Sequence, residues 1–308
     1  MGDVLRWMRE RRRHPRPPDR STFTRAVPTF PVPRAGADVI TATWVGHSTV
    51  LLQVGGLNIL TDPVWSERAS PVWFAGPRRR VPPAVRLDAL PPLDVVLLSH
   101  DHYDHLDRRT VRALAAAQPA AVWCVPLGVG ALVRRFGVRQ VSELDWWDET
   151  GAAGATVGCT PAQHFSGRGI GDRGDRLWCG WVVIANGRRV FFAGDTALHP
   201  EFGRIAERWG PFDLVLLPIG AYEPRWFMRA VHMNPDDAMA AYRALAGSGA
   251  PPLMVPIHWG TFKLTDEPMD EPARRFREQW QAAGLAGERL WLLAHGETRA
   301  LPPRRVSA

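Results

Sequence analysis

The feature that most constrains this chain is a run of metal-ligand side chains placed directly after an apolar segment. Residues 94–99 read Asp-Val-Val-Leu-Leu-Ser, a pattern typical of a buried strand, and residues 100–105 read His-Asp-His-Tyr-Asp-His. Because alternate side chains of an extended segment point the same way, His100 and His102 can share one metal ion. The last two ligand-type residues of the run follow where the chain turns into a predicted helix, and they can reach a second ion.

Three more ligand-type side chains also follow apolar segments. His164 comes after Thr-Pro-Ala-Gln, Asp195 after Phe-Phe-Ala-Gly, and His258 after Val-Pro-Ile. Taken singly, each is more simply a buried histidine or a turn aspartate. Taken with the run at 100–105, they predict one site where several strand ends meet. A water held between two metal ions can ionise near neutral pH, since metal binding lowers its pKa to about 7. The pattern therefore predicts a two-metal hydrolase.

The rest of the sequence predicts a layered α/β protein. Strands are expected at 40–45, 49–54, 57–61, 94–99, 181–185, 189–193, 213–218, 253–257 and 290–293, with hairpin turns at Gly55-Gly56 and Asn186-Gly187. Helices are expected at 108–117, capped by Asp107, and at 235–245 and 272–283. Residues 63–92 are rich in Pro and Arg, and long irregular segments of this kind are often substrate loops or lids. Strands and helices interspersed in this way indicate a sandwich.

Composition and charge exclude several classes of protein. Hydrophobic residues make up 45% and charged residues 22% of the 308 residues, as in ordinary globular enzymes. The net charge is +7, but residues 1–20 carry seven arginines against three acids, which leaves only +3 for the remainder. A nucleic-acid groove is therefore not expected. Cys124, Cys159 and Cys179 have no paired spacing, which favours a reducing compartment.

The amino-terminal part reads as a basic Pro/Arg-rich arm, residues 1–38, before a single domain at 39–308. The arm lacks the apolar segment of a secretory signal, and no apolar run approaches the ~20 residues that span a bilayer. We therefore expect a cytoplasmic protein. Residues 1–13 could form a short amphipathic helix on an anionic membrane. We favour the simpler interpretation, a frayed and solvated basic end.

As a set, the ligand-type residues resemble those of the metallo-β-lactamase superfamily, and the resemblance spans residues 40–296. It implies an αββα sandwich of two mixed β-sheets flanked by helices, with the site at one edge. It also implies two zinc ions, or iron or manganese in their place. The implied ligands are His100, His102 and His164 for one ion, Asp104, His105 and His258 for the other, and Asp195 between them. Asp62 also matches a superfamily position, and we interpret it as structural.

Flanking segments more specifically resemble the N-acylphosphatidylethanolamine-hydrolysing phospholipase D family. They include Trp-Val-Gly-His-Ser-Thr at 44–49, Pro-Ile-Gly-Ala-Tyr-Glu-Pro at 218–224 and Ile-His-Trp-Gly-Thr-Phe at 257–262. The resemblance implies a zinc-dependent phosphodiesterase that uses a metal-bound hydroxide and releases phosphatidic acid and an N-acylethanolamine. The chain departs from the family at Ala197, where a glycine is usual, and at Val231, where the lipid enzyme has a polar amide.

The same resemblance suggests roles for further side chains. We expect Asp104, Asp195 and His232 to take part in catalysis, although His232 could equally be a surface histidine at a helix start. Contacts with a substrate are expected from Tyr103, Tyr222, Trp226, Phe227 and Met228, for which ordinary core packing is the alternative. His47 and His295 are expected to be structural or to support the ligands.

Other functions stay open on the sequence alone. The same site could serve a lactonase or ester hydrolase acting on a small sugar-phosphate-like substrate. A nucleic-acid phosphodiesterase and a non-catalytic metal-dependent binding protein are further alternatives. The expected partner is a small-molecule or phospholipid substrate, with peripheral contact to an anionic membrane and an oligomer both open.

Overall fold

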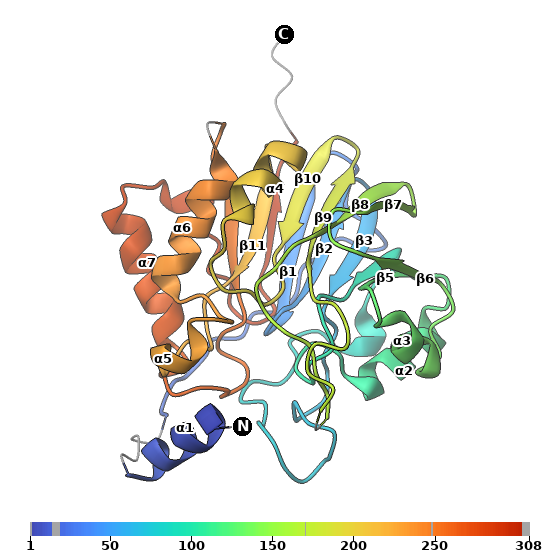
Figure 1. Cartoon of the computed structure of the whole chain (residues 1–308). Helices are drawn as coiled ribbons and strands as arrows, with labels where there is room; N and C mark the ends of the chain where they lie inside the picture. Colours follow the sequence, from blue (N-terminus) through green and yellow to red (C-terminus); the bar gives the residue numbers. More distant parts are fainter. Residues whose placement is uncertain (1, 14–18, 170, 248, 304–308) are drawn as a thin grey trace.

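The computed structural model describes residues 2–13, 19–169, 171–247 and 249–303, and its centre is a pair of β-sheets packed face to face (Figure 1). The first sheet has the order β13 (Thr298–Leu301), β1 (Ile40–Gly46), β2 (Thr49–Val54), β3 (Leu57–Thr61), β4 (Val95–Leu97), β5 (Val122–Pro126) and β6 (Val141–Leu144). The second has the order β12 (Leu253–Ile257), β11 (Leu214–Pro218), β10 (Arg188–Phe192), β9 (Gly180–Ala185), β8 (Ala155–Thr160) and β7 (Glu149–Ala152). Both sheets are mixed, because each contains parallel and antiparallel pairs.

Helices cover the outer face of each sheet, which completes the predicted αββα sandwich. The α-helices are α1 (Gly2–Arg13), α2 (Arg108–Ala117), α3 (Gly130–Arg135), α4 (Glu201–Trp209), α5 (Arg225–Met228), α6 (Pro235–Ala246) and α7 (Glu271–Ala282), with short 3-10 turns at Leu87–Ala89 and Gly287–Arg289. The apolar faces of α4, α6 and α7 share one buried cluster with the second sheet. Val111 and Leu114 of α2 and Val133 of α3 pack in another cluster against the first sheet. Figure 1 shows these two helical layers on opposite sides of the molecule.

The layer between the sheets is apolar and holds them together. Every residue of β1, β2 and β11 is buried, as expected for strands covered on both faces. Trp181 of β9 is fully buried, and its indole nitrogen donates to the backbone oxygen of Leu98, 2.7 Å away and directly after β4 of the other sheet. Burial of the large ring and pairing of its one polar group therefore act together at the contact between the sheets.

Most predicted elements are present, and one strand is wrong. The helix at 108–117 begins where expected, with the Asp107 side chain accepting from the Arg109 backbone. Residues 290–293 do not form the expected last strand: Leu290 makes only an isolated bridge with Met254 before the chain crosses to the first sheet. The last strand is β13, which pairs with β1. An apolar run identifies burial, but it does not identify which segment has a free strand edge to join.

The amino-terminal helix α1 is docked on the domain through Trp7 and Arg11, so the expected frayed end is wrong for residues 2–13, although most of its described side chains are exposed. Trp7 donates from its indole nitrogen to Asp266 at 2.8 Å, and its ring centre lies 5.6 Å from that of Phe227. Arg11 also pairs with Asp266, at 3.1 Å. Figure 1 shows α1 next to α5, at the lower edge of the molecule. No helix within the described residues is long and apolar enough to cross a bilayer.

Candidate metal centre

The ends of four strands deliver the ligand-type side chains to one edge of the sandwich. The run at 100–105 follows β4 of the first sheet. His164 follows β8, Asp195 follows β10, and His258 follows β12, all in the second sheet. Their ligand atoms fall into groups in which every atom lies within 4.8 Å of the others. The predicted meeting of strand ends is therefore what the structure shows.

The first cluster consists of three imidazoles. The Nδ1 atom of His102 lies 2.9 Å from Nε2 of His100 and 3.2 Å from Nε2 of His164. The opposite ring nitrogens are held in place: Nδ1 of His100 lies 2.9 Å from the Ser99 hydroxyl, and Nδ1 of His164 lies 2.9 Å from the backbone oxygen of Val231. Such outer contacts fix the orientation of each ring and leave one nitrogen facing the cluster.

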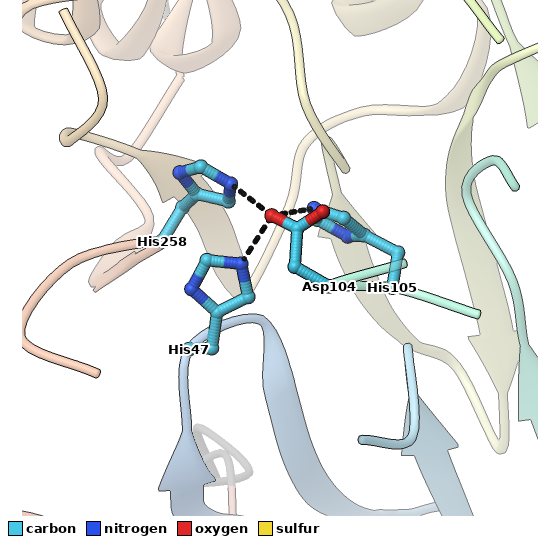
Figure 2. Close-up of side chains that lie close together, drawn as sticks. All are labelled: His47, Asp104, His105 and His258. Carbon is cyan, nitrogen blue, oxygen red and sulfur yellow. Dashed lines mark hydrogen bonds and ion pairs between the residues drawn. The ribbon is translucent and has the colours of Figure 1, made fainter. Parts of the chain in front are cut away.

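The second cluster is built around the Asp104 carboxylate (Figure 2). Its Oδ2 atom lies 3.4 Å from Nε2 of both His105 and His258. The same oxygen lies 2.9 Å from Nε2 of His47, which comes from the turn between β1 and β2. His105 is oriented from behind, because its Nδ1 lies 2.6 Å from the buried carboxylate of Asp62. The two residues expected to be structural, His47 and Asp62, thus contact the ligand-type residues directly.

Asp195 connects the two clusters. Its Oδ2 atom lies 3.0 Å from Nε2 of His258 and 3.1 Å from Nε2 of His105. It lies 3.9 Å from Nε2 of His164, in the first cluster. A carboxylate in this position can bridge two metal ions, as the sequence suggests. Asp195 is buried, so its charge needs compensation from the site itself.

The electrostatics of the site favour bound cations. Burial opposes ionisation of Asp104 and Asp195, but the nearby imidazoles, His105 first, keep the pKa of both carboxyls well below the usual range. Burial also opposes charge on His105, yet Asp195 and Asp104 raise its pKa well above the usual value. The pKa of His258 is raised to about 9 against the effect of burial, chiefly by Asp195. The carboxylates therefore attract positive charge, which protons or metal ions can supply.

The donor atoms present fit metal ions. Among the described residues, Nε2 of His105, Nε2 of His258 and Oδ1 of Asp195 are buried without a hydrogen-bond partner. Leaving such atoms unpaired costs about 1–3 kcal/mol each, and more for charged groups. A divalent ion between them would use these lone pairs. Imidazole and carboxylate donors are those found in zinc, iron and manganese sites.

The backbone is constrained where it presents these groups. His47, Asp62 and His258 have positive φ angles of 57°, 29° and 60°, which side chains with a Cβ rarely adopt. Such conformations persist where surrounding structure enforces them, and they concentrate at functional sites. The backbone geometry therefore marks the second cluster as a site held in place against local preference.

Comparison with known proteins identifies the family. A family model described as a beta-lactamase superfamily domain matches residues 57–259, which include the run at 100–105 and the three later ligand-type residues. The match covers more than half of the chain. The chain belongs to the metallo-β-lactamase superfamily.

Relatives of this superfamily member include phospholipases. It is 43% identical over 252 residues to N-acyl-phosphatidylethanolamine-hydrolyzing phospholipase D 1 of Caenorhabditis elegans, covering 78% of this chain and 70% of the relative. It is 46% identical over 257 residues to an uncharacterised protein of Mycobacterium tuberculosis (strain ATCC 25618 / H37Rv), covering 80% and 68%. A metallo hydrolase from Ignicoccus hospitalis KIN4/I shares the fold, with a TM-score of 0.64, 23% identity and coverage of 86% and 100%. The chain is a metal-dependent hydrolase of the metallo-β-lactamase superfamily.

The structure places His232 next to the metal centre rather than on the surface. Only 7% of its surface is exposed, and its Nδ1 lies 3.9 Å from Oδ2 of Asp195. Its ring centre is 4.9 Å from that of His164. Burial lowers the pKa of His232 to about 3, so the imidazole is neutral at neutral pH. The surface interpretation of this residue is therefore wrong.

The expected substrate-binding residues divide into different surroundings. The Tyr103 hydroxyl donates to the backbone oxygen of Arg168, whose guanidinium lies 3.9 Å from the tyrosine ring centre. Tyr222 is fully buried and donates its hydroxyl to Glu271 of α7, so its expected contact with substrate is wrong. The remaining three residues, Trp226, Phe227 and Met228, lie on α5. The first two are covered in part by α1, through Arg6 and Trp7, and Met228 is buried.

Sequence reasoning left His47 and Asp62 without a specific partner. Each occupies a sharp turn after a strand, in Gly-His-Ser at 46–48 and Thr-Asp-Pro at 61–63. A polar residue with a positive φ angle directly after a buried strand is the signal that points to a contact with the ligand-type residues. The sequence does not reveal this angle when the residue is not a glycine. The contacts with Asp104 and His105 depend on tertiary structure.

Substitution of His47 tests whether it orients Asp104. We expect His47→Ala to lower kcat by about 10- to 100-fold, the usual effect of losing an outer contact to a metal ligand. We expect His47→Gln, which can still donate a hydrogen bond, to recover part of that loss. Turnover of a bis-aryl phosphodiester and metal content per chain are the measurements. His199→Ala is the matched control, because His199 stacks on Phe202 away from both clusters. Equal losses in the two alanine variants would show that His47 has no special role.

Proposed function

We propose that this hydrolase is a phosphodiesterase of phospholipase D type that acts on N-acylphosphatidylethanolamine-like lipids. The observation that carries the proposal is the 43% identity to the Caenorhabditis elegans phospholipase, which extends over 78% of this chain. A set of seven ligand-type side chains at one edge of the fold, five of them buried and two partly buried, is consistent with that chemistry.

The proposed ligand assignment follows the two clusters. One metal ion would be held by His100, His102 and His164, the other by Asp104, His105 and His258, and Asp195 would contact both. Bound there, zinc, iron or manganese would supply Lewis acidity toward phosphoryl oxygens and would lower the pKa of a water. Zinc is our proposal for the cell, because four-coordinate sites rich in imidazole are typical of it.

The chain's own groups would orient the substrate and donate a hydrogen bond to the leaving group. Asp104 and Asp195 hold negative charge at fixed positions, since the nearby imidazoles keep the pKa of both carboxyls well below the usual range. We propose that the neutral imidazole of His232 donates a hydrogen bond to the oxygen of the departing ethanolamine, because it lies beside Asp195 with an Nδ1 atom that lacks a hydrogen-bond partner among the described residues. Water supplies the proton that this oxygen gains. Water and the phosphodiester then give phosphatidic acid and an N-acylethanolamine.

The exposed side chain of α5 and the metal cluster suggest where a lipid would lie. Trp226 remains 42% exposed beside α1, and Tyr103 lies within the ligand run. We propose that these two contact the substrate, with Phe227 and Met228 supporting Trp226 from the same helix. We also propose that the protein acts in the cytoplasm, since Cys124, Cys159 and Cys179 are buried and free.

A substrate comparison on the purified, metal-loaded protein tests this function. We expect hydrolysis of N-acylphosphatidylethanolamine in mixed micelles, with phosphatidic acid and N-acylethanolamine detected by mass spectrometry. A lactone panel, including sugar-phosphate lactones, is run at the same enzyme concentration. Faster turnover of a lactone than of any phosphodiester would replace the phospholipase with the lactonase alternative. Release of nucleotides from an oligonucleotide at a higher rate would favour a nuclease instead.

A further inference from the structure

One loop of the protein exposes an unusual group of apolar side chains. Within the irregular segment 63–92, residues 70–76 read Ser-Pro-Val-Trp-Phe-Ala-Gly and carry no charge; we call them the aromatic loop. Trp73 is 75% exposed and Phe74 is 64% exposed, and their rings meet edge to face with centres 5.6 Å apart. Val72 beside them is 38% exposed. Adjacent exposed apolar side chains of this size mark interaction surfaces, whereas isolated ones do not.

The aromatic loop is held in its projecting position by its own base. Arg68 donates from Nε to the backbone oxygen of Trp73 at 3.1 Å, and from Nη1 to that of Gly76 at 2.7 Å. The backbone nitrogen of Ala69 donates to Pro77 at 3.0 Å, which closes the two ends of the loop. Both side chains at the tip are therefore presented by a fixed backbone, although they contact little of the protein.

Behind the aromatic loop lies a cationic hollow of about 850 Å³, which we call the arginine bowl. Its arginines are Arg68, Arg108, Arg109, Arg112, Arg135 and Arg168, and its acids are Glu67 and Asp107. The acids are already engaged, Glu67 by Arg78 and Asp107 by the start of α2. In contrast, Arg109, Arg112 and Arg135 form no ion pair within the described part of the chain.

The bowl includes one residue of the ligand run. Tyr103 lines it and lies between His102 and Asp104 in the ligand run. Trp73 and Val72 line the same bowl from the loop side. Figure 1 shows the segment that contains the aromatic loop, coloured cyan, at the lower edge of the molecule, where α1 also lies. One face thus combines exposed aromatic side chains with arginines that form no ion pair among the described residues, and it includes one residue of the ligand run.

We propose that this face docks on an anionic phospholipid bilayer, with Trp73 and Phe74 inserted at the interface and the arginine bowl bound to lipid phosphates. Aromatic rings with a polar or polarisable edge partition to the headgroup level, and each arginine near an anionic surface adds attraction. The inference goes beyond the proposed function, since the lipids bound in this way need not be the substrate.

The arrangement favours a bilayer over a nucleic acid. Single-stranded nucleic acids bind in basic grooves whose floor carries aromatic rings, so that successive bases stack on them. Here Phe74 lies outside the bowl, and Trp73 is 75% exposed at the tip of the loop. Two other aromatic rings line the bowl, but Arg168 lies 3.9 Å from the ring centre of Tyr103 and Arg108 lies 5.8 Å from that of Phe136, so a cation already occupies a face of each ring. An apolar tip backed by cationic side chains matches the layered chemistry of a bilayer surface.

Vesicle sedimentation tests the proposal without turnover. The vesicles contain phosphatidylcholine alone or with phosphatidylglycerol, and neither lipid is N-acylated. We expect strong binding only to the anionic vesicles, weakened by salt. We expect Trp73→Ala with Phe74→Ala, and separately Arg109→Gln with Arg112→Gln, to reduce the partition coefficient by about tenfold or more. The control Arg243→Gln with Arg277→Gln removes the same charge from exposed positions on α6 and α7, and should reduce binding less than about twofold.

Two results would overturn the inference. One is that the wild-type protein sediments equally with vesicles with and without phosphatidylglycerol, or that both test variants sediment as the wild type does. The other is tighter binding to a single-stranded oligonucleotide than to vesicles, with the same variants losing it. Each variant must keep the wild-type melting temperature, which the exposed positions allow. Failed vesicle binding with intact hydrolysis of N-acylphosphatidylethanolamine in micelles would reject this surface and leave the proposed function standing; the reverse result would reject the function alone.

Discussion

Replacing Asp195 with asparagine is expected to reduce kcat on a bis-aryl phosphodiester on the order of a thousandfold, beyond the roughly 10- to 100-fold typical of outer contacts to metal ligands. The physical reason is that Oδ2 of Asp195 lies within 3.1 Å of ring nitrogens of His105 and His258 and faces His164 from the other cluster. The amide keeps the shape of the side chain and removes the negative charge that both clusters share. Turnover and metal content per chain are measured together.

The matched control for this substitution is Asp175→Asn, at an exposed position whose carboxylate makes no ion pair within the described residues. It should leave kcat and metal content at the wild-type values. If Asp195→Asn retains wild-type turnover at full metal content, the bridging role is wrong. If it retains turnover with about one metal ion per chain, a single ion suffices for the reaction.

Removing the metal ions is expected to abolish turnover and to lower the melting temperature. A ligand present at a hundred times its Kd stabilises the folded state by about 2.7 kcal/mol. Each kcal/mol shifts Tm by roughly 2–4 °C in domains of about 150–250 residues, so dialysis against a chelator should lower Tm by at least about 5 °C. The shift is limited because His105 and His258, whose pKa values are raised, can take up protons beside Asp104 and Asp195.

Differential scanning calorimetry with metal analysis measures this effect, and readdition of zinc, iron or manganese shows which ion restores turnover. Asp195→Asn serves as the internal control, because a weakened site should respond less to the chelator. Wild-type turnover and an unchanged Tm in protein that metal analysis shows to be free of metal would contradict a metal-dependent reaction.

Much of the site could be predicted from the sequence because strand ends carry its ligands. An apolar run followed by a histidine or aspartate is a local pattern, and the four such patterns meet because parallel and antiparallel strands end at shared edges. The αββα architecture and the superfamily followed from the same set and are confirmed. The individual roles of the ligand-type residues remain predictions that the substitutions above address.

What could not be predicted depends on contacts between distant segments. His47 meets Asp104 through Nε2 at 2.9 Å, although 57 residues separate them in the chain. Tyr222 lies in a segment that resembles the phospholipase family, yet its hydroxyl donates to Glu271. Likewise, the contact that docks α1 joins Trp7 to Asp266, which are 259 residues apart in the chain. A local sequence pattern cannot reveal such a contact, so the docking of α1 is not predictable from residues 1–13. Periodicity and residue type report burial, whereas the partner is decided by tertiary packing.

The placement of the ligands on both sheets has a consequence for how the protein matures. Ligands from the first sheet end at position 105, and those from the second begin at position 164 and finish at position 258. Neither part of the chain can assemble a complete site by itself during synthesis. High affinity for metal therefore arises only when the last strands have docked, since a preformed site is absent from the unfolded chain. A complete set of ligands for either ion therefore requires both sheets to be folded and packed together.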